Sequence, residues 1–418
     1  MLTGSNLVHT REFNLRIVHE VIRLHGPLSR AEVARHTALT GQTVSNLVKE
    51  LVELGLVTEG ERVLSGGRGA PGTLLALNPD GCYAIGLDFN RDHLTGVLVD
   101  LAGTVRQRAS IEFELPTPDQ ALDLMSEMVD ALIARQGLER EQVCGVGIGI
   151  PGPMYQADGG VGYVVNPKMF PGWHKVPLAD WLRERLDLPV LLENNATAAA
   201  VGERWYGEGR RIGTFFYLFF GSGLGGAIVI NGRPYEGATG NAGEVGYLPA
   251  TLAGAPDADG ASDDRPHVGL HFNLPRLYDA LRADGADARS PEDLERLLAE
   301  GHPRIVAWLD EASDYLTGIV LAVEYIVDPE AIFFGGRLPD GLLDAFMARV
   351  AERLPARRVT EKAVAPRLLR GTVGADAAAL GVATLPVYQF FAPAPQVLLK
   401  QRTRRPGGGL LVRRAAAR

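Results

Sequence analysis

Cysteine is scarce in this chain of 418 residues, which contains two, Cys82 and Cys144. Two cysteines exclude a disulfide framework and a cysteine-rich metal site, and they suit a reducing cytoplasm. The first residues lack the apolar core of a signal peptide. The longest apolar stretch begins at Thr214 and is interrupted by glycines and a serine, so it predicts two buried strands and a turn, not a membrane span. We therefore expect a cytoplasmic protein with no membrane partner.

A strong charge of one sign is also missing. The net charge is −8, from 42 Lys and Arg against 50 Asp and Glu. This balance argues against a protein that coats nucleic acid, but it permits a local DNA-binding module. The apolar fraction of 46% is ordinary for a globular protein, and the length predicts two or three domains.

The N-terminal residues, 11–57, predict three short helices. The apolar face of the first helix is expected to hold Leu15, Val18, Ile22 and Leu24. Ser29 and Glu32 form the sequence signature of a capping box at the start of the second helix. Thr40 is expected to cap the third helix. The buried face of the third helix is expected to consist of Val44, Leu47, Val48 and Leu51. Two apolar segments around a Gly/Arg/Pro stretch then predict a β-hairpin with a long tip, which completes a winged helix-turn-helix.

The third helix carries short polar side chains opposite its apolar face, as a helix that reads the major groove requires. An arginine between glycines at the hairpin tip suits a narrow minor groove. The expected DNA-contacting residues are Gln42, Thr43, Ser45, Asn46, Lys49 and Arg68. Residues 1–75 hold eight basic and seven acidic residues, so DNA affinity would depend on two heads of a dimer binding together. The alternative is a three-helix protein-binding domain with an ordinary solvated face.

From Tyr83 onward, strand-like and helix-like segments alternate, which predicts two α/β lobes around a cleft. Strands are expected at 83–89, 94–100, 104–115, 142–150, 188–194, 214–220 and 331–336. Helices are expected at 119–136, 196–205, 308–327 and 377–388. Residues 249–266 predict a polar loop, and the basic, Pro/Gly-rich C-terminal residues predict a disordered tail.

Long motifs in a fixed order resemble the ROK family, which contains sugar kinases and sugar-sensing repressors. GPLSRAEVARHTALTGQTVSNLVKELVELGLV resembles the start of its repressors. GVGIGIPGP, NPKMFPGW, VLLENNATAAAVGE, GSGLGGAIVI and GNAGEVGY resemble, in order, its kinase-like domain. The resemblance runs from Phe13 to Tyr388. It implies an α/β protein with a winged helix-turn-helix at 1–80, a two-lobed actin/hexokinase-like ROK domain at 81–390, and a basic tail at 391–418.

Two departures from the family's kinases bear on chemistry. The resemblance places their general base, an aspartate, where Asn195 stands, and loss of a general base costs roughly 10² to 10⁴ in rate. Their phosphate-binding Asp-x-Gly-Gly-Thr turn reads DFNRD at residues 88–92, without either glycine and with an acid at Asp92. The second glycine loop, 221–226, is kept. We therefore expect a pseudokinase that is not an enzyme and needs no cofactor.

Sugar contacts are implied by the same resemblance, chiefly for Asn194 and Glu244. The family's zinc-binding histidine is Tyr247 here and its zinc-binding cysteines are missing, so no metal is expected. His271 is a candidate replacement for an acidic sugar contact. The full set of expected sugar-binding residues is Asn166, Asn194, Asn195, Glu244, Tyr247 and His271.

These features together predict a transcriptional regulator of carbohydrate metabolism, a repressor that binds operator DNA and a sugar effector as a homodimer or homotetramer. Sugar is expected to favour a closed body and to reposition the heads through the linker at 77–81. Three alternatives remain: an active ATP-dependent sugar kinase with a DNA-binding head, a scaffold with an inactive pocket, and a ligand-independent regulator controlled by a protein partner.

Overall fold

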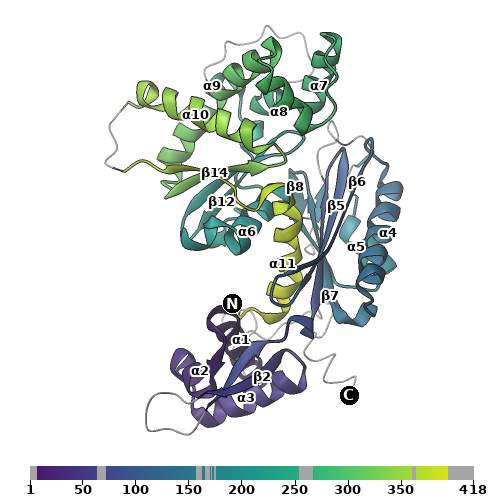
Figure 1. Cartoon of the computed structure of the whole chain (residues 1–418), viewed down its shortest axis with the longest axis vertical. Coiled ribbons are helices and arrows are strands. Elements are labelled where there is room, and N and C mark those ends of the chain that lie inside the picture. Colours follow the sequence, from purple (N-terminus) through teal and green to yellow (C-terminus); the bar gives the residue numbers. More distant parts are fainter. Residues whose placement is uncertain are drawn as a thin grey trace.

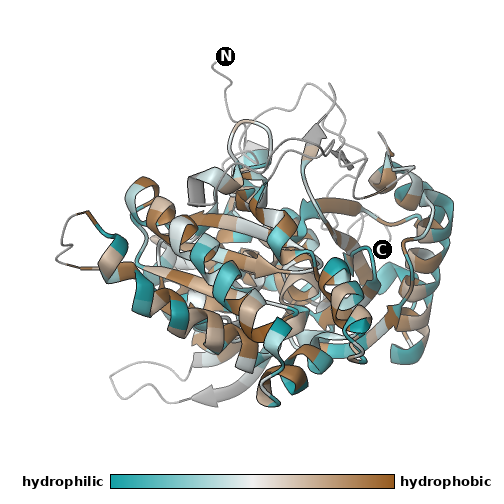
Figure 2. Ribbon diagram, turned by 90° about the horizontal axis from the view of Figure 1, so that it is seen from above, coloured by the Kyte–Doolittle hydropathy of each residue, from teal (hydrophilic) through white to brown (hydrophobic). Residues whose placement is uncertain are grey.

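The computed structural model describes residues 7–63, 72–156, 162–164, 170, 172–173, 176–253, 267–359 and 364–393. A small N-terminal module lies at one end of a two-lobed α/β body, and α11 runs between the lobes toward that module (Figure 1). Apolar residues concentrate on the central strands and on the inward sides of the helices (Figure 2). Of the helices that the structure describes, none is long and apolar enough to cross a membrane.

The N-terminal module has the three expected helices and a small sheet. Its elements are α1 (Leu7–His25), β1 (Leu28–Ser29), α2 (Arg30–Thr37), α3 (Gly41–Glu53), β2 (Val57–Val63) and β3 (Gly72–Leu77), with strand order β1-β3-β2. The capping box of Ser29 and Glu32 and the Thr40 cap are confirmed. The expectation for Leu24 is wrong, because this side chain is 56% exposed. It lies two positions after buried Ile22, about 200° around the helix.

The first lobe is a five-stranded sheet of order β10-β7-β4-β5-β6. The strands are β4 (Tyr83–Phe89), β5 (His93–Asp100), β6 (Val105–Glu112), β7 (Val143–Ile150) and β10 (Val190–Asn194). The helices α4 (Pro118–Gln136) and α5 (Leu178–Leu186) pack on one face and bury a core with the sheet. The short strands β8 (Met154–Gln156) and β9 (Gly162–Val164) pair with each other. Because β4, β7 and β10 are parallel, their C-terminal ends meet at one edge, where the cleft opens.

The second lobe is a sheet of order β13-β12-β11-β14-β15. The strands are β11 (Phe215–Phe220), β12 (Leu224–Ile230), β13 (Arg233–Pro234), β14 (Ala331–Gly336) and β15 (Arg367–Arg370). The helices α7 (Leu274–Ala283), α8 (Pro291–Ala299), α9 (Pro303–Ile326) and α10 (Asp340–Arg357) belong to the core on one face of this sheet. On the other face lie α6 (Asn195–Tyr206) and α11 (Ala377–Phe391).

The helix α11 packs against both lobes and against the N-terminal module. It crosses α6 where Gly381 permits backbone contact, since a Cβ there would lie 1.7 Å from the oxygen of Ala198. It also presses on β7, where a Cβ at Gly147 would lie 1.9 Å from the oxygen of Val382. Its end joins the N-terminal module, and both contribute to one hydrophobic core (Figure 1). The helix continues to Phe391, which is buried.

Candidate ligand-binding cleft

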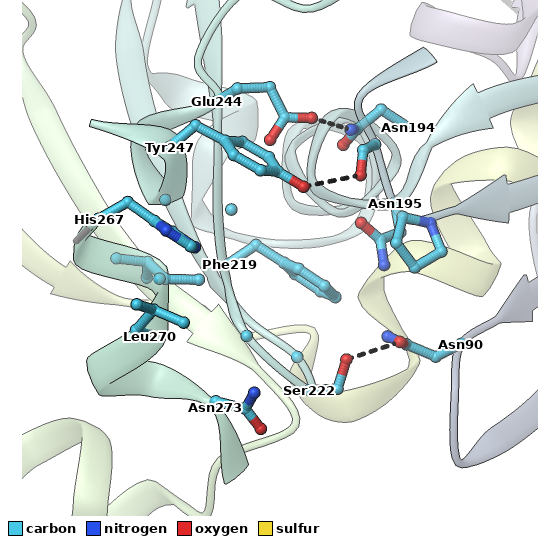
Figure 3. Close-up of a pocket in the computed structure, with 18 of the residues that line it drawn as sticks. Asn90, Asn194, Asn195, Phe219, Ser222, Glu244, Tyr247, His267, Leu270 and Asn273 are labelled. Atoms are coloured by element: carbon cyan, nitrogen blue, oxygen red, sulfur yellow. Dashed lines mark hydrogen bonds between the residues drawn. The ribbon is translucent and has the colours of Figure 1, made fainter. Parts of the chain in front are cut away.

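A cavity of about 170 Å³ lies between the two lobes. The first lobe contributes the ends of β4, β7 and β10, and the second lobe contributes the β11–β12 turn and the short helices at 245–247 and 268–272 (Figure 3). Sites for drug-sized ligands typically measure about 300–1,000 Å³. The cavity therefore suits one small molecule. Its polar lining residues include Asn90, Asn194, Asn195, Ser222, Glu244, Tyr247, His267 and Asn273.

Asn194 is fixed by its position at the start of a helix. Its Oδ1 caps α6 by accepting hydrogen bonds from the amides of Ala196 at 2.8 Å and Thr197 at 3.3 Å. This leaves its Nδ2 to donate to Glu244 Oε1 at 2.8 Å. The side chain of Asn195, the first residue of α6, faces the cavity in Figure 3 and carries a neutral amide. Two of the expected sugar-binding residues are thus brought to the same wall.

Glu244 is the acidic member of the described lining. Burial raises its pKa to about 7, although the hydrogen bond from Asn194 acts in the opposite direction. Gly152 of the first lobe lies close to this carboxyl, since a Cβ there would lie 2.0 Å from Glu244 Oε1 and would displace that side chain. Burial also raises the pKa of the neighbouring carboxyl of Glu193 to about 7. A carboxyl in this state exchanges a proton near neutral pH, so the charge of this part of the cavity wall changes near neutral pH.

An aromatic pair forms another part of the wall. The rings of Tyr247 and His267 stack with their centroids 5.8 Å apart and their planes 15° apart. The Tyr247 hydroxyl lies 3.4 Å from the carbonyl oxygen of Gly152, to which it donates. Such a pair offers a flat apolar face beside hydrogen-bonding groups, a common arrangement in small-molecule sites.

His271 does not reach the cavity, contrary to the expectation for it. Its Nδ1 lies 2.9 Å from Glu311 Oε1, and its ring stacks on Tyr315 with the centroids 4.0 Å apart. The cause is the 3₁₀ geometry of residues 268–272, in which positions three apart are eclipsed. His271 therefore shares the face of buried Val268, while Leu270 and His267, just before the turn, line the cavity. The sequence alone does not show which of these two histidines faces the cavity, so His267 was not among the expected sugar-binding residues.

The turn expected to depart from a phosphate loop, residues 88–92, forms the end of β4 and leads into β5. Asn90 reaches the cavity and accepts a hydrogen bond from Ser222 at 2.9 Å. Asp92 lies 2.7 Å from His93 Nδ1. Burial alone raises the pKa of Asp92, but the bond to His93 and the charge of Arg337 bring it below its usual value. Asp92 is therefore an ionised carboxylate that forms ion pairs at this turn.

His93 is almost completely buried beside that carboxylate, at 1% exposure. Its Nε2 lies 3.4 Å from Asp88 Oδ2. Burial alone lowers the pKa of His93, and the two neighbouring carboxylates, Asp88 and Asp92, raise it above its usual value. The sequence did not indicate His93 or Arg337 as candidates. The two residues come from opposite lobes, and no short sequence pattern predicts that they meet.

The expected DNA-contacting residues of α3 lie together on one side of the N-terminal module. Gln42, Asn46 and Lys49 are exposed, and Thr43 and Ser45 are partly exposed. Gln42 Nε2 donates to Asn46 Oδ1 at 3.2 Å, which aligns the two amides on adjacent turns. Two expectations fall on Arg68 and Asn166, which lie outside the described residues. Within the described ranges, no group of three or more His, Cys, Asp or Glu side chains is arranged to hold a metal ion.

Comparison with known proteins finds similarity for both the N-terminal module and the two-lobed body. Residues 84–267 match the ROK family, and residues 11–69 match the MarR family. The y4fQ protein of Sinorhizobium fredii is 29% identical over 383 residues, which are 90% of this chain and 91% of that protein. A xylose repressor of Bacillus spizizenii is 30% identical over 239 residues, which cover 57% of this chain and 60% of the repressor.

A similar fold occurs in a crystal structure of a ROK family transcriptional regulator, a homologue of the E. coli MLC protein. The sequences are 20% identical, and the superposition has a TM-score of 0.71. It covers 93% of this chain and 99% of the other. The likeness therefore extends over both the N-terminal module and the two-lobed body.

Proposed function

We propose, from the premise that this chain joins a ROK family domain to an N-terminal MarR-like winged helix-turn-helix, that it is a sugar-responsive, DNA-binding transcriptional repressor. The observation that carries the proposal is the pairing of two surfaces in one chain. One is the outward polar face of α3, and the other is an interlobe cavity lined by amides, a carboxylate and an aromatic pair. A relative is named a xylose repressor, so D-xylose is the first effector to test.

The cavity chemistry supports a neutral sugar as the ligand. Glu244 offers carboxylate oxygens that accept from hydroxyl groups. The Oδ1 of Asn194 is used in capping α6, so Asn194 can only donate through Nδ2, while the amide of Asn195 can donate and accept. Tyr247 supplies a ring against which the apolar face of a sugar can pack. Asn166 stays in the proposed set, and His267 replaces His271 in it.

The body is proposed to bind sugar without phosphorylating it. The support is the amide of Asn195 at the cavity, which has no useful basicity for removing a proton from a hydroxyl. The rival function, an ATP-dependent sugar kinase, predicts turnover of ATP with a sugar in a coupled assay. Turnover above the buffer background with D-xylose, D-glucose or N-acetylglucosamine would favour that rival.

Two helices connect the cavity with the DNA-reading module. The first, α6, begins at the cavity with Asn194 as its cap and ends beside α1. There the guanidinium of Arg23 lies 4.3 Å from the ring centre of Trp205. Because α6 is a single helix of 12 residues, we infer that a shift at its start is transmitted to its other end.

The second connection is the end of α11. Arg16 of α1 donates to the carbonyl oxygens of Gln389 at 2.9 Å and Ala392 at 3.3 Å. His19 stacks on Phe391 with the ring centroids 5.0 Å apart, and burial lowers its pKa to about 4, so the ring is neutral. We infer that these contacts, together with the linker at 77–81, transmit closure of the body to the heads of a homodimer or homotetramer.

Operator binding with and without D-xylose tests the proposal. Duplexes selected from random DNA by the purified protein supply the operator, and fluorescence anisotropy gives its Kd. We expect D-xylose to weaken operator binding at least tenfold, as a coupling between two sites of about 1–3 kcal/mol allows. Equal operator affinity with every neutral sugar tried would contradict the proposal.

The connection through α6 has its own variant. Arg23→Met removes the contact with Trp205, and we expect it to keep operator affinity but reduce the effect of D-xylose roughly threefold or more, within the usual range for residues along a coupling route. Arg11→Met is the matched control, because Arg11 pairs with Glu50 inside the DNA-reading module. An identical D-xylose effect in both variants and the unaltered protein would contradict the route.

A further inference from the structure

A hydrogen bond between buried side chains joins the lobes beside the cavity. Ser222 Oγ, from the β11–β12 turn, donates to Asn90 Oδ1, from the β4–β5 turn, at 2.9 Å (Figure 3). Asn90 is 1% exposed and Ser222 is 8% exposed. The Asn90 backbone amide donates to the His93 carbonyl oxygen at 2.9 Å, so the turn that presents this side chain is itself closed. The hydrogen bond therefore links two turns of defined backbone conformation, one from each lobe.

A second contact between the same lobes lies at the other end of the β4–β5 turn. Arg337 Nη1, from the loop after β14, lies 3.4 Å from Asp92 Oδ2 and 2.6 Å from His93 Nδ1. The Arg337 backbone is anchored in the second lobe, where its amide donates to the Phe220 carbonyl oxygen at 2.7 Å. It follows Gly336, whose φ of +119° favours glycine. The arginine is thus held in place to reach across.

The first lobe presents an acidic group, Asp92, to this arginine. His93 Nδ1 lies 2.7 Å from Asp92 Oδ1, and its Nε2 faces Asp88. Asp88 is 1% exposed, and its Oδ1 has no hydrogen-bond partner within the described part of the chain. Burying such acidic groups is costly unless a cation lies near them. His93 lies beside Asp88, and Arg337 supplies a permanent charge to Asp92 from the opposite lobe, so Asp92 is paired best when the lobes are together.

We propose that Asn90–Ser222 and Asp92–Arg337 form an interlobe latch that favours the closed cleft, whose closure the sugar completes, and so preorganises the cavity for its sugar. The proposal rests on the proposed sugar-sensing function for the identity of the ligand, and on the contacts alone for the latch. Because the latch shifts the open–closed equilibrium toward the closed form, closing around the sugar costs less free energy, and the latch raises sugar affinity.

Hydrogen–deuterium exchange of the unliganded protein tests the latch without any sugar. Arg337→Met keeps much of the stem but removes the charge, and Ser222→Ala removes the other contact. Arg353→Met is the matched control, because Arg353 contacts Asp310 and Asp314 inside the second lobe and its side chain is 25% exposed, against 20% for Arg337. We expect exchange in residues 88–94 and 219–224 to quicken roughly tenfold in both latch variants and not in the control.

Titration with D-xylose in a calorimeter tests the consequence. We expect Arg337→Met to weaken D-xylose binding about tenfold and Arg353→Met to leave it within twofold. Unchanged exchange at both turns in both latch variants would overturn the latch. Faster exchange with unchanged D-xylose affinity would overturn its role in preorganising the cavity. If the unaltered protein binds no neutral sugar, the proposed function fails, and the exchange result still decides whether the latch exists.

Discussion

The two ends of the cleft use similar polar side chains to opposite effect. At the Glu244 end, Asn194 and Glu244 bond to each other once and keep further donor and acceptor capacity toward the cavity. At the Asp92 end, Ser222 donates to Asn90 and Arg337 contacts Asp92, so these side chains bond to one another across the lobes. Polar residues in a cleft thus indicate a ligand only where their hydrogen-bonding capacity is left over.

Removing the acceptor at the Glu244 end has the largest expected effect. Glu244→Gln keeps the shape but loses the charge, and charge-assisted hydrogen bonds contribute about 1.5–3 kcal/mol each. We expect D-xylose binding to weaken roughly 10- to 100-fold in calorimetric titration. Glu236→Gln, which neutralises a carboxylate outside the described lining of the cavity, is the control. If Glu244→Gln binds D-xylose as well as the control does, the sugar does not bind at the Glu244 end of the cleft.

The next largest expected effect is the pH dependence of sugar binding, which tests the role of the Glu244 end of the cleft. The pKa of Glu244 is raised to about 7, so its carboxyl is largely protonated at pH 5.5 and ionised at pH 8. Hydroxyl donors prefer the ionised form, and we expect D-xylose affinity to rise roughly tenfold across that range. The trend should vanish in Glu244→Gln and persist in Glu193→Gln. A flat profile in the unaltered protein would contradict the assignment.

Stability without sugar should follow pH in the opposite direction over the same window. A carboxyl whose folded pKa is raised stabilises the protein below its unfolded pKa of about 4.3, and this contribution is lost as pH rises through about 7. In Glu193→Gln and Glu244→Gln, the fall in Tm between pH 5 and 8 should be smaller than in the unaltered protein. An equal fall in all three proteins would show that neither carboxyl is perturbed.

A carboxylate placed at position 195 has the smallest expected effect on binding. Asn195→Asp supplies a base at the cavity, but the turn at 88–92 lacks glycines, and its carboxylate at Asp92 is paired with Arg337. We expect no ATP turnover with D-xylose and a change in sugar affinity of about threefold or less. Phosphorylated sugar detected by mass spectrometry with Asn195→Asp would show that the Asp92 end still accepts a nucleotide.

Local rules made part of the structure predictable from sequence. The capping box of Ser29 and Glu32 and the cap at Thr40 depend on residues three positions apart, and both form as expected. The helical period also identified Val44 and Leu51 as buried. Such signals need no knowledge of the rest of the fold.

Contacts between distant segments were not predictable. Ser222 and Asn90 are separated by 132 positions, and Arg337 and Asp92 by 245. The misplacement of His271 has a local cause, since a 3₁₀ turn changes which of two histidines faces the cavity. The positions that carry the latch become visible only when the lobes are assembled.

The most direct measurement is one calorimetric experiment on the unaltered protein with two titrants, D-xylose and the non-hydrolysable ATP analogue AMP-PNP. The difference between the two ends of the cleft predicts saturable binding of the sugar, no binding of the nucleotide, and a sugar affinity that AMP-PNP does not change. Binding of AMP-PNP, or a sugar affinity that depends on it, would mean that the Asp92 end is a working nucleotide site.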